Sequence, residues 1–466
     1  MGIENNRCTG ICENCGKCIG ANILSEKQGI KEKLSFMPED FVADKMWKYG
    51  ISFDIGTTTV VGNLWDLEKG RSLQIIGKTN PQIIFGADVI SRINYCEDDS
   101  VKFKIIRDKI TGCLNDIIKE LLTNNKIEKQ DIIKLTVAGN TTMSHIFAGF
   151  NPKTLARAPF APAYSGEKVF KAREVLLNLD PETEVILLSN IAGHIGGDIT
   201  AGILATRMED LKGMTIFIDI GTNGEIVLSK NDKIYACSTA AGPAFEGAFI
   251  HQGMRAEAGA IEKMEIKNGI VSFKTVENKE PAGICGSGII QVIGELLKTG
   301  IINKSGRLLM PVELEGVKLS DDLKSRLREN TDGREFVIVF KQEKADIVIT
   351  QKDIREVQLA KGAIYSGIML LLGLLNEEIK NVDRVILGGA FGSYLNKESA
   401  VEIGILPDID LNKIISAGNT AGTGASLVLL SEAERKKATH IAEKTEHLEL
   451  ANCSNFQEEF LKAMSF

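Results

Sequence analysis

The sequence has little of what marks a membrane or secreted protein. Its longest apolar runs, such as Ile368 to Leu375, are far shorter than the ~20 residues that a membrane-spanning helix needs. The opening residues, MGIENNRCTG, lack the apolar segment of a secretory signal. We therefore expect a cytoplasmic protein that has no membrane partner.

An excess of positive charge is also missing. The formal net charge is −7, and charged residues make up 25% of the 466 residues. A protein of this charge has no general attraction for nucleic acid, so we expect no nucleic-acid partner. The sequence Gly-x-x-x-x-Gly-Lys-Ser/Thr is absent as well, which excludes a P-loop ATPase.

Cysteine is unevenly distributed. Four of the nine cysteines lie within the first eighteen residues, at the spacing C-x₃-C-x₂-C-x₂-C, namely Cys8, Cys12, Cys15 and Cys18. Zinc sites usually divide their ligands between two separate pairs, whereas one tight run is typical of a ferredoxin ligand string. The spacing favours a 4Fe–4S cluster, with a 2Fe–2S cluster or zinc as the alternatives. The other five cysteines are scattered singly, as is typical of buried apolar side chains.

The strongest internal signal is a repeat. The segment YGISFDIGTTTVVGNLWDL, from Tyr49, matches MTIFIDIGTNGEIVLSK, from Met214. Each copy is an apolar strand that ends in Asp-Ile-Gly-Thr, followed by a turn and a second strand. The two aspartates, Asp54 and Asp219, are about one domain length apart. The repeat predicts two copies of one α/β unit that face each other across a cleft.

Composition and pattern also suggest the domain boundaries. Alternating strands, glycine turns and helices after Tyr49 indicate an α/β class with largely parallel sheets. We predict four parts: a cysteine module and tether, 1–48; a first lobe, 49–212; a second lobe, 213–430; and a C-terminal helical segment that packs back on the lobes, 431–466.

The two hairpins have the residues that a nucleotide site needs. A glycine directly after a strand lets the backbone approach phosphate, and the next amides and hydroxyls can donate to it. A strand-end aspartate suits Mg²⁺, which bridges carboxylate and phosphate, so Asp54 and Asp219 are the predicted magnesium ligands. The predicted ATP-binding residues are Gly56, Thr57, Thr58, Thr59, Gly221, Thr222, Asn223 and, in a later strand–glycine loop, Gly388, Gly389 and Gly392.

These hairpins and the late loop resemble those of the superfamily of actin, sugar kinase and heat-shock chaperone ATPases. The resemblance implies actin-like, ribonuclease H-like lobes around a nucleotide cleft. It also implies a carboxylate that orients the attacking water, and Asp198 in GHIGGDITAG takes that position. Catalysis is therefore assigned to Asp198 with Asp54 and Asp219. Glu246, in AAGPAFEGAFI, is the other candidate for the water-activating residue.

Within this superfamily, several motifs resemble the reductive activators of corrinoid proteins. They are GNTTM, APFAPAY, STAAGPAFEGA, GICGSG, VILGGAFGSYLN and SAGNTAGTGA, in that order along residues 49–466. The resemblance implies an ATPase that drives one electron into a corrinoid methyl-carrier protein, converting Co(II) to Co(I). It also implies a homodimer and a ferredoxin-like electron donor. The short cysteine module departs from the family, whose better-known members have a longer 2Fe–2S domain.

Three other functions fit part of the pattern. An activator of radical dehydratases also couples this fold to an iron–sulfur cluster, which it holds with cysteines inside the lobes. Of the cysteines that this chain has there, only Cys237 and Cys285 lie near the motif loops. A small-molecule kinase has little use for clustered thiolates, and a nucleotide-binding redox sensor is the third alternative. The histidines His145, His194 and His251 are not assigned as metal ligands, and His145 is expected in the core.

Overall fold

The structure is a computed structural model that describes residues 41–44, 46, 48–314, 319–392 and 395–466. The predicted cluster ligands Cys8, Cys12, Cys15 and Cys18 lie outside the described residues, so the iron–sulfur module stays a prediction. The chain divides into two compact units. The first takes the chain up to Phe217 with Val227–Ala236 and Ser416–Leu448, and the second takes Ile218–Ile226, Cys237–Ile415 and Glu449–Phe466.

The first unit contains a mixed six-stranded sheet in the order β3-β2-β1-β4-β6-β5. Its strands are β1 (Tyr49–Ile55), β2 (Thr59–Asp66), β3 (Arg71–Thr79), β4 (Ile132–Gly139), β5 (Lys168–Lys171) and β6 (Glu184–Leu187). The β1–β2–β3 pairs are antiparallel, whereas β1, β4 and β6 run parallel. The carboxyl ends of the three parallel strands therefore lie at one edge, where α/β sheets bind ligands.

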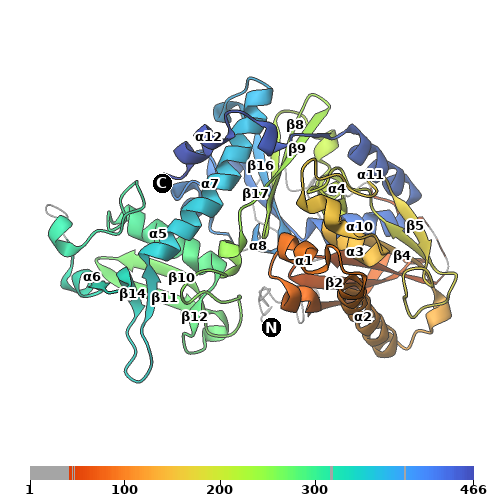
Figure 1. Ribbon diagram of the computed structural model, residues 1–466, viewed down its shortest axis with the longest axis horizontal. Helices are drawn as coiled ribbons and strands as arrows, with labels where there is room; N and C mark the ends of the chain where they lie inside the picture. Colours follow the sequence, from red (N-terminus) through yellow and green to blue (C-terminus); the bar gives the residue numbers. More distant parts are fainter. Residues whose placement is uncertain (1–40, 45, 47, 315–318, 393–394) are drawn as a thin grey trace, which may run out of the picture. The chain divides into compact units, whose positions relative to one another are not determined.

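Helices cover both faces of this sheet (Figure 1). They are α1 (Val89–Cys96), α2 (Ser100–Asn125), α3 (Thr141–Ala148), α4 (Gly197–Ala205), α10 (Thr420–Leu430) and α11 (Glu432–Lys444). Phe53 in β1 packs in the core cluster that includes Ile117 of α2. The neighbouring Ser52 hydrogen-bonds Ser426 of α10, with 2.9 Å between the hydroxyl oxygens. Because successive strand side chains point to opposite faces, α2 and α10 cover opposite sides of β1.

The described residues before β1 pack against the C-terminal end of α10. Phe41, Ala43 and Met46 pack against a cluster that includes Trp65, Leu67, Leu429 and Leu430. The Asp44 amide donates to the Leu430 carbonyl at 2.9 Å, and the Asp44 carboxylate accepts from the Glu432 amide at 2.7 Å. The segment before β1 is thus fixed at the junction between α10 and α11.

A second six-stranded sheet has the order β17-β16-β7-β8-β9-β18. Its strands are β7 (Thr215–Ile220), β8 (Gly224–Lys230), β9 (Lys233–Thr239), β16 (Arg384–Gly388), β17 (Ile414–Gly418) and β18 (Glu446–His447). Five of them, in the order β9-β8-β7-β16-β17, correspond to β3-β2-β1-β4-β6 of the first sheet. The predicted α/β class and its duplicated strand pattern are confirmed.

The second unit contains two three-stranded sheets and several helices. The strands are β10 (Ala260–Lys267), β11 (Ile270–Thr275), β12 (Gly283–Ile284), β13 (Leu327–Asn330), β14 (Gly333–Val339) and β15 (Ile347–Thr350). The helices are α5 (Gly286–Lys298), α6 (Asp321–Ser325), α7 (Gln351–Leu374), α8 (Gly389–Gly392), α9 (Lys397–Glu402) and α12 (Phe456–Ala463). Among the described residues, α7 alone is long and apolar enough to cross a membrane, and 72% of its most apolar window is buried inside the protein.

Candidate nucleotide-binding site

The turn between β1 and β2 needs a glycine at its first position. The Gly56 amide donates to the Thr59 carbonyl at 2.9 Å, which closes the turn. A Cβ atom added to Gly56 would lie 2.7 Å from that same carbonyl oxygen, closer than real Cβ contacts come. The hairpin can therefore be this tight only with glycine at position 56.

Three successive carbonyls of this turn are held by residues that follow β3. Asn80 donates from its side chain to the Gly56 carbonyl at 2.9 Å and from its backbone to the Thr58 carbonyl at 2.8 Å. Arg92 donates to the Thr57 carbonyl between them at 2.6 Å. In a trans peptide the N–H points opposite to the C=O, so the next three amides, of Thr57, Thr58 and Thr59, are directed away from Asn80 and Arg92. Consecutive amides turned to one side form an anion-binding concavity.

Asp54 ends the strand that leads into this turn. Its carboxylate accepts a hydrogen bond of 2.9 Å from the Asn419 side chain. Asn419 also caps α10, because its side-chain oxygen accepts from the Gly422 amide at 2.7 Å. The start of α10 thus lies beside the carboxylate at the end of β1.

Two further helices of the first unit begin at the same edge. Asn140, the N-cap of α3, accepts from the Met143 amide at 2.9 Å and donates to the Thr57 hydroxyl at 3.0 Å. A Cβ atom on Gly196, just before α4, would lie 2.5 Å from the Asn140 Cα atom. Asp198 lies in the first turn of α4 and accepts from the Ile199 amide at 2.8 Å. Helix N-termini carry partial positive charge, so this edge favours an anion such as phosphate.

The second hairpin, between β7 and β8, lies in the second unit. The Gly221 amide donates to the Asn223 carbonyl at 2.9 Å. Gly389 of the late glycine loop has a φ of +73°, and a Cβ atom there would lie 2.4 Å from an Asp219 carboxylate oxygen. Burial raises the pKa of Asp219 from 3.8 to about 6. A bound divalent cation would stabilise the charged form of this carboxylate.

Glu246 contacts the second hairpin. Its carboxylate accepts a hydrogen bond of 2.7 Å from the Thr222 hydroxyl. It ends the 3-10 helix Pro243–Glu246, which is flanked by Gly242 and Gly247 at φ values of 75° and 86°. Asp198 lies in the first unit and Glu246 in the second, and each is near one hairpin. The assignment of Asp198 as the water-activating residue stays a prediction.

The predicted residues thus form two groups, one in each unit. The first unit gathers Asp54, Gly56, Thr57, Thr58, Thr59 and Asp198 along one edge of its sheet. The second unit gathers Asp219, Gly221, Thr222, Asn223, Gly388 and Gly389. A Cβ atom on Gly392 would lie 3.1 Å from the Leu387 Cβ atom, so this position is closely packed, and its role in ATP binding stays a prediction. That the two groups bind one nucleotide is a prediction.

The residue pattern missed three residues that support the first hairpin. Asn419 was within reach, since an asparagine directly after a strand and before an apolar helix is typical of an N-cap. Asn80 carried a similar signal, because an asparagine directly before a proline is typical of an N-cap, and Asn80 caps the 3-10 helix Pro81–Phe85. Arg92 carried none. A single arginine within SRINYC gives no indication that it will be fully buried and bonded to a turn 35 positions earlier.

The histidine and cysteine predictions can be compared with the described residues. His145 is buried, accepts from the Ala163 amide at Nε2 (2.9 Å) and bonds the Thr141 carbonyl at Nδ1 (2.7 Å), which confirms a core role. Burial lowers its pKa to about 4. Cys96, Cys113, Cys237 and Cys285 are buried, as expected, whereas Cys453 is only partly buried. Burial raises the pKa of Cys237. The described residues contain no group of three or more His, Cys, Asp or Glu side chains placed to hold a metal ion.

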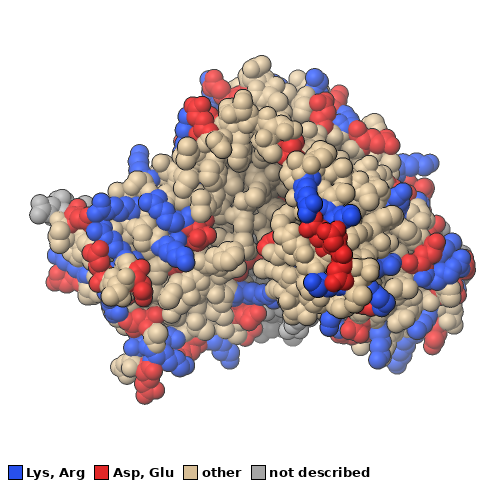
Figure 2. Space-filling view, in the orientation of Figure 1, with Lys and Arg blue, Asp and Glu red and all other residues tan. Residues whose placement is uncertain are grey.

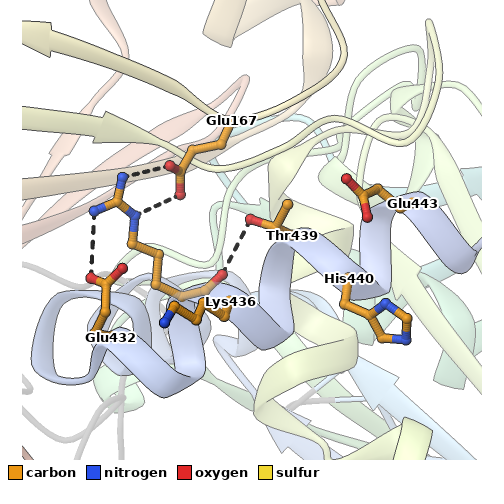
Figure 3. A pocket seen from close by; sticks show the side chains of 7 residues that line it. Glu167, Glu432, Lys436, Thr439, His440 and Glu443 are labelled. Carbon is orange, nitrogen blue, oxygen red and sulfur yellow. Dashed lines mark hydrogen bonds and ion pairs between the residues drawn. The ribbon is translucent and has the colours of Figure 1, made fainter.

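A separate pocket of about 250 Å³ lies along α11 (Figure 3). It is lined by Glu167, Glu432, Arg435, Lys436, Thr439, His440 and Glu443. Arg435 spans it with two hydrogen bonds to the Glu167 carboxylate, at 2.9 and 2.6 Å. It contains no residue of either hairpin, so it is separate from the predicted nucleotide site. On the face shown in Figure 2, acidic and basic side chains are interspersed over each unit.

Comparison with known proteins gives consistent matches along the chain. Residues 213–466 match the C-terminal domain of RACo, the ASKHA domain, and residues 49–211 match the RACo middle region. The chain is 39% identical to the corrinoid activation enzyme RamQ of Eubacterium limosum over 422 residues, covering 90% of this chain and 70% of RamQ. It is 25% identical over 464 residues to the Co(II) methylated amine-specific corrinoid protein reductase of Methanosarcina barkeri, covering 90% of this chain and 77% of the reductase.

A solved structure is similar over most of the chain. It is that of a reductive activator for a corrinoid, iron–sulfur protein, which superposes with a TM-score of 0.79 at 39% identity. The match covers 91% of this chain and 67% of that structure.

Proposed function

The chain belongs to the RACo family of reductive activators of corrinoid proteins, and from this premise we propose that it uses ATP to drive one electron into a corrinoid protein, reducing Co(II) to Co(I). Membership confirms the resemblance that the motifs predicted. It favours corrinoid activation over the radical-dehydratase activator, the kinase and the redox sensor.

The residues present fit a magnesium–nucleotide complex. The first hairpin directs the amides of Thr57, Thr58 and Thr59 to one side, next to the N-termini of α3 and α4. Strand-end carboxylates at Asp54 and Asp219 are the oxygen ligands that Mg²⁺ prefers. A bound Mg²⁺ would neutralise charge on the phosphates and orient them for attack by water. The observation that carries this proposal is the set of hydrogen bonds from Asn80 and Arg92 to three successive hairpin carbonyls, from which the direction of the following amides is inferred.

The chain's own residues then have separate tasks. The amides of the first hairpin bind phosphate oxygens, and Asn419 holds the Asp54 carboxylate in place. Asp198, in the first turn of α4, is proposed to orient the attacking water and accept its proton. Gly389 gives the late loop room beside Asp219.

The electron path is proposed from the cysteine run. An iron–sulfur cluster on Cys8, Cys12, Cys15 and Cys18 would supply one electron at low potential, with 4Fe–4S favoured over 2Fe–2S. A ferredoxin-like donor would reduce the chain again after each transfer. We further propose a homodimer that acts in the cytoplasm.

ATP can assist this transfer only through a difference between nucleotide states. Each ~59 mV of uphill one-electron transfer costs a factor of ten in the equilibrium constant. The nucleotide-bound form must therefore favour the Co(I) form of the corrinoid partner over the Co(II) form more strongly than the nucleotide-free form does. If the ratio of the Co(I) and Co(II) affinities is the same with and without nucleotide, ATP leaves the cobalt potential unchanged.

Anaerobic visible spectroscopy of candidate corrinoid partners tests the proposal. With reductant, this chain and Mg·ATP, the Co(II) spectrum should convert to that of Co(I), and omission of ATP should slow the conversion by at least tenfold. Asp54→Asn should behave like omission of ATP. Asp66→Asn is the matched control, because Asp66 also ends a strand of the same sheet but pairs with Lys69 and Arg71. Conversion that is equally fast without ATP contradicts the proposal.

A further inference from the structure

The outer edge of β3 has no strand beside it among the described residues. β3 closes one side of the first six-stranded sheet and has β2 as its neighbour on the other. In the second sheet the corresponding strand β9 is covered, because β18 pairs with it in parallel and the Leu448 amide donates to the Ala236 carbonyl at 2.8 Å. Within the described residues, the first sheet thus lacks the extra strand that its counterpart has.

Alternate peptide groups of β3 point away from β2. The Asn80 amide donates to the Thr58 carbonyl, so every second residue of β3 counted back from Asn80 bonds to β2. Ile75 and Gly77 belong to the other set, and their amides and carbonyls are directed outward. No described group forms a hydrogen bond with these two backbones. Gly77 is buried, and buried backbone groups nearly always have a partner, so this edge needs one.

This edge is also long and weakly protected. β3 has nine residues, and only Arg71 and Lys78, near its ends, are charged. β5, at the opposite edge of the same sheet, has four residues and a lysine at each end, Lys168 and Lys171. Short length and lysine side chains keep an edge strand from pairing with other segments. β5 is therefore protected, whereas β3 is suited to accept another strand.

The chain itself reaches this edge. Ala43 lies at the turn between β2 and β3, because a Cβ atom on Gly70 would lie 3.1 Å from the Ala43 Cβ atom. Phe41, two residues earlier, packs against the same hydrophobic cluster as Ile75 of β3. The chain that precedes Phe41 therefore starts next to β3, and it is 40 residues long in the sequence.

We propose that residues 32–40 pair with the outer edge of β3 as an antiparallel strand. Their number matches the nine residues of β3. The direction follows from the described residues, since the step back from Ala43 to Phe41 leads from the start of β3 towards the cluster that contains Ile75. The acidic end of this segment, Glu39-Asp40, then lies beside Arg71, whose side chain is 63% exposed.

The sequence of residues 32–40, EKLSFMPED, is compatible with such a strand. Leu34 and Phe36 alternate with Lys33 and Ser35, which is the pattern of a strand with one apolar face. Pro38 has no amide proton, but an edge strand uses only every second amide for pairing, and proline is found on edge strands for this reason.

This pairing brings the arm to the first phosphate hairpin. β3 leads into Asn80, which bonds to the Gly56 and Thr58 carbonyls, so the residues before 32 leave the sheet at that end of β3. Residues 19–30 then join this point to the cysteine run. A cluster held near the hairpin rests on the proposed function, whereas the strand pairing does not.

Photo-crosslinking of the full-length chain tests the pairing without added nucleotide. The photoreactive residue p-benzoylphenylalanine replaces Lys78 on β3, whose side chain is 35% exposed, or, as the matched control, Val169 on β5, which is 47% exposed. A mixture of normal and ¹⁵N-labelled chains separates crosslinks within a chain from those between chains. The probe at position 78 should react with residues 31–37 of its own chain, and the probe at position 169 should not.

Hydrogen exchange, resolved to single amides by mass spectrometry, measures the pairing from the side of β3. The double variant Leu34→Asp, Phe36→Asp places two charges on the apolar face of the segment and should release it. The outward amides of Ile75 and Gly77 should then exchange at least tenfold faster than in wild type. The amide of Ile76, which is directed at β2, should keep its rate.

The double variant Ile23→Asp, Leu24→Asp is the matched control, because these two apolar residues precede the proposed strand. It should leave the exchange rates of β3 unchanged. A probe at position 78 that reacts with a second chain, or that does not react with residues 31–37, overturns the inference. Wild-type exchange at Ile75 and Gly77 in the Leu34 and Phe36 variant overturns it as well. None of these results depends on ATP hydrolysis or corrinoid reduction, so the proposed function is tested separately.

Discussion

Asn419 donates a hydrogen bond of 2.9 Å to the carboxylate of Asp54, although 365 positions separate them in the chain. The same side chain accepts from the Gly422 amide at 2.7 Å and so begins α10. One amide group therefore stabilises a helix start and orients a predicted magnesium ligand. The two tasks can be separated by substitution.

Asn419→Ala should impair both tasks. Loss of an N-cap asparagine costs ~1 kcal/mol of unfolding free energy, and loss of the Asp54 contact should lower ATPase activity about tenfold. Asn419→Ser should keep the cap, because serine caps about as well as asparagine, but its short side chain cannot also hold Asp54. Chemical unfolding and Mg-dependent ATPase assays measure the two effects.

A matched cap is available in α9 as the control for this prediction. Asn396 begins α9 and accepts from the Ser399 amide at 2.8 Å. Asn396→Ala should lower stability by a similar ~1 kcal/mol with wild-type ATPase activity. If Asn419→Ser retains full activity, the Asp54 contact has no functional weight.

Asp219 should make stability depend on pH. Its pKa is raised by burial from 3.8 to about 6, so between these values the folded protein keeps a proton that the unfolded chain has lost. The unfolding free energy therefore falls as pH rises through this window, by ~3 kcal/mol at most. Asp219→Asn removes the effect. In the absence of nucleotide and Mg²⁺, the variant should gain stability relative to wild type between pH 4 and pH 7.5.

Urea unfolding of both proteins at several pH values measures this difference directly. Other groups that titrate contribute equally to wild type and variant, so the difference isolates Asp219. A difference that stays constant from pH 4 to pH 7.5 would show that this carboxyl group titrates normally.

Gly389 should not tolerate a side chain. Gly389→Ala adds a Cβ atom 2.4 Å from the Asp219 carboxylate and strains a backbone with φ of +73°. Gly300→Ala is the matched control, since Gly300 has the same φ of +73° but no atom within 4 Å of the added Cβ. Both should lose ~1–2 kcal/mol of stability from backbone strain. Only Gly389→Ala should also lose Mg·ATP affinity in a binding titration, and equal affinities in the two variants would contradict the assigned position of the late loop.

The amino-terminal cysteines should determine the iron content. Anaerobically purified protein is expected to contain about four iron atoms per chain if the cluster is 4Fe–4S, and about two if it is 2Fe–2S. Cys12→Ser should lower iron and the visible charge-transfer absorbance. Cys453→Ser should change neither, because Cys453 is a single cysteine at the other end of the sequence. Protein that holds zinc and no iron would exclude the proposed electron path.

The strand–glycine pattern was sufficient to predict the α/β class and the two hairpins. The reason is that Asp54–Thr59 and Asp219–Gly224 are local features, in which a strand, a glycine and a turn are adjacent in sequence. The same locality places Asp198 at the start of α4 and Gly389 after β16. Features that depend on a few neighbouring residues can be read from one sequence.

The support behind the first hairpin could not be predicted in this way. The contacts of Asn80, Arg92 and Asn419 with the β1 region span 24, 35 and 365 positions. Each depends on how separate segments pack, and polar residues within a sequence do not reveal which of them will be buried with partners. Each unit also contains segments that are far apart in sequence. The first unit, for example, includes Ser416–Leu448 from near the C-terminus.

Helix α10 is buried at every position, from Thr420 to Leu430. At its N-terminal end the Asn419 side chain donates a hydrogen bond to the Asp54 carboxylate. At its C-terminal end the Leu430 carbonyl accepts one from the Asp44 amide. The eleven residues of this helix span ~16 Å, and they separate the predicted magnesium ligand from the segment that precedes β1. A single buried helix consequently connects the predicted magnesium ligand Asp54 to the segment that precedes β1.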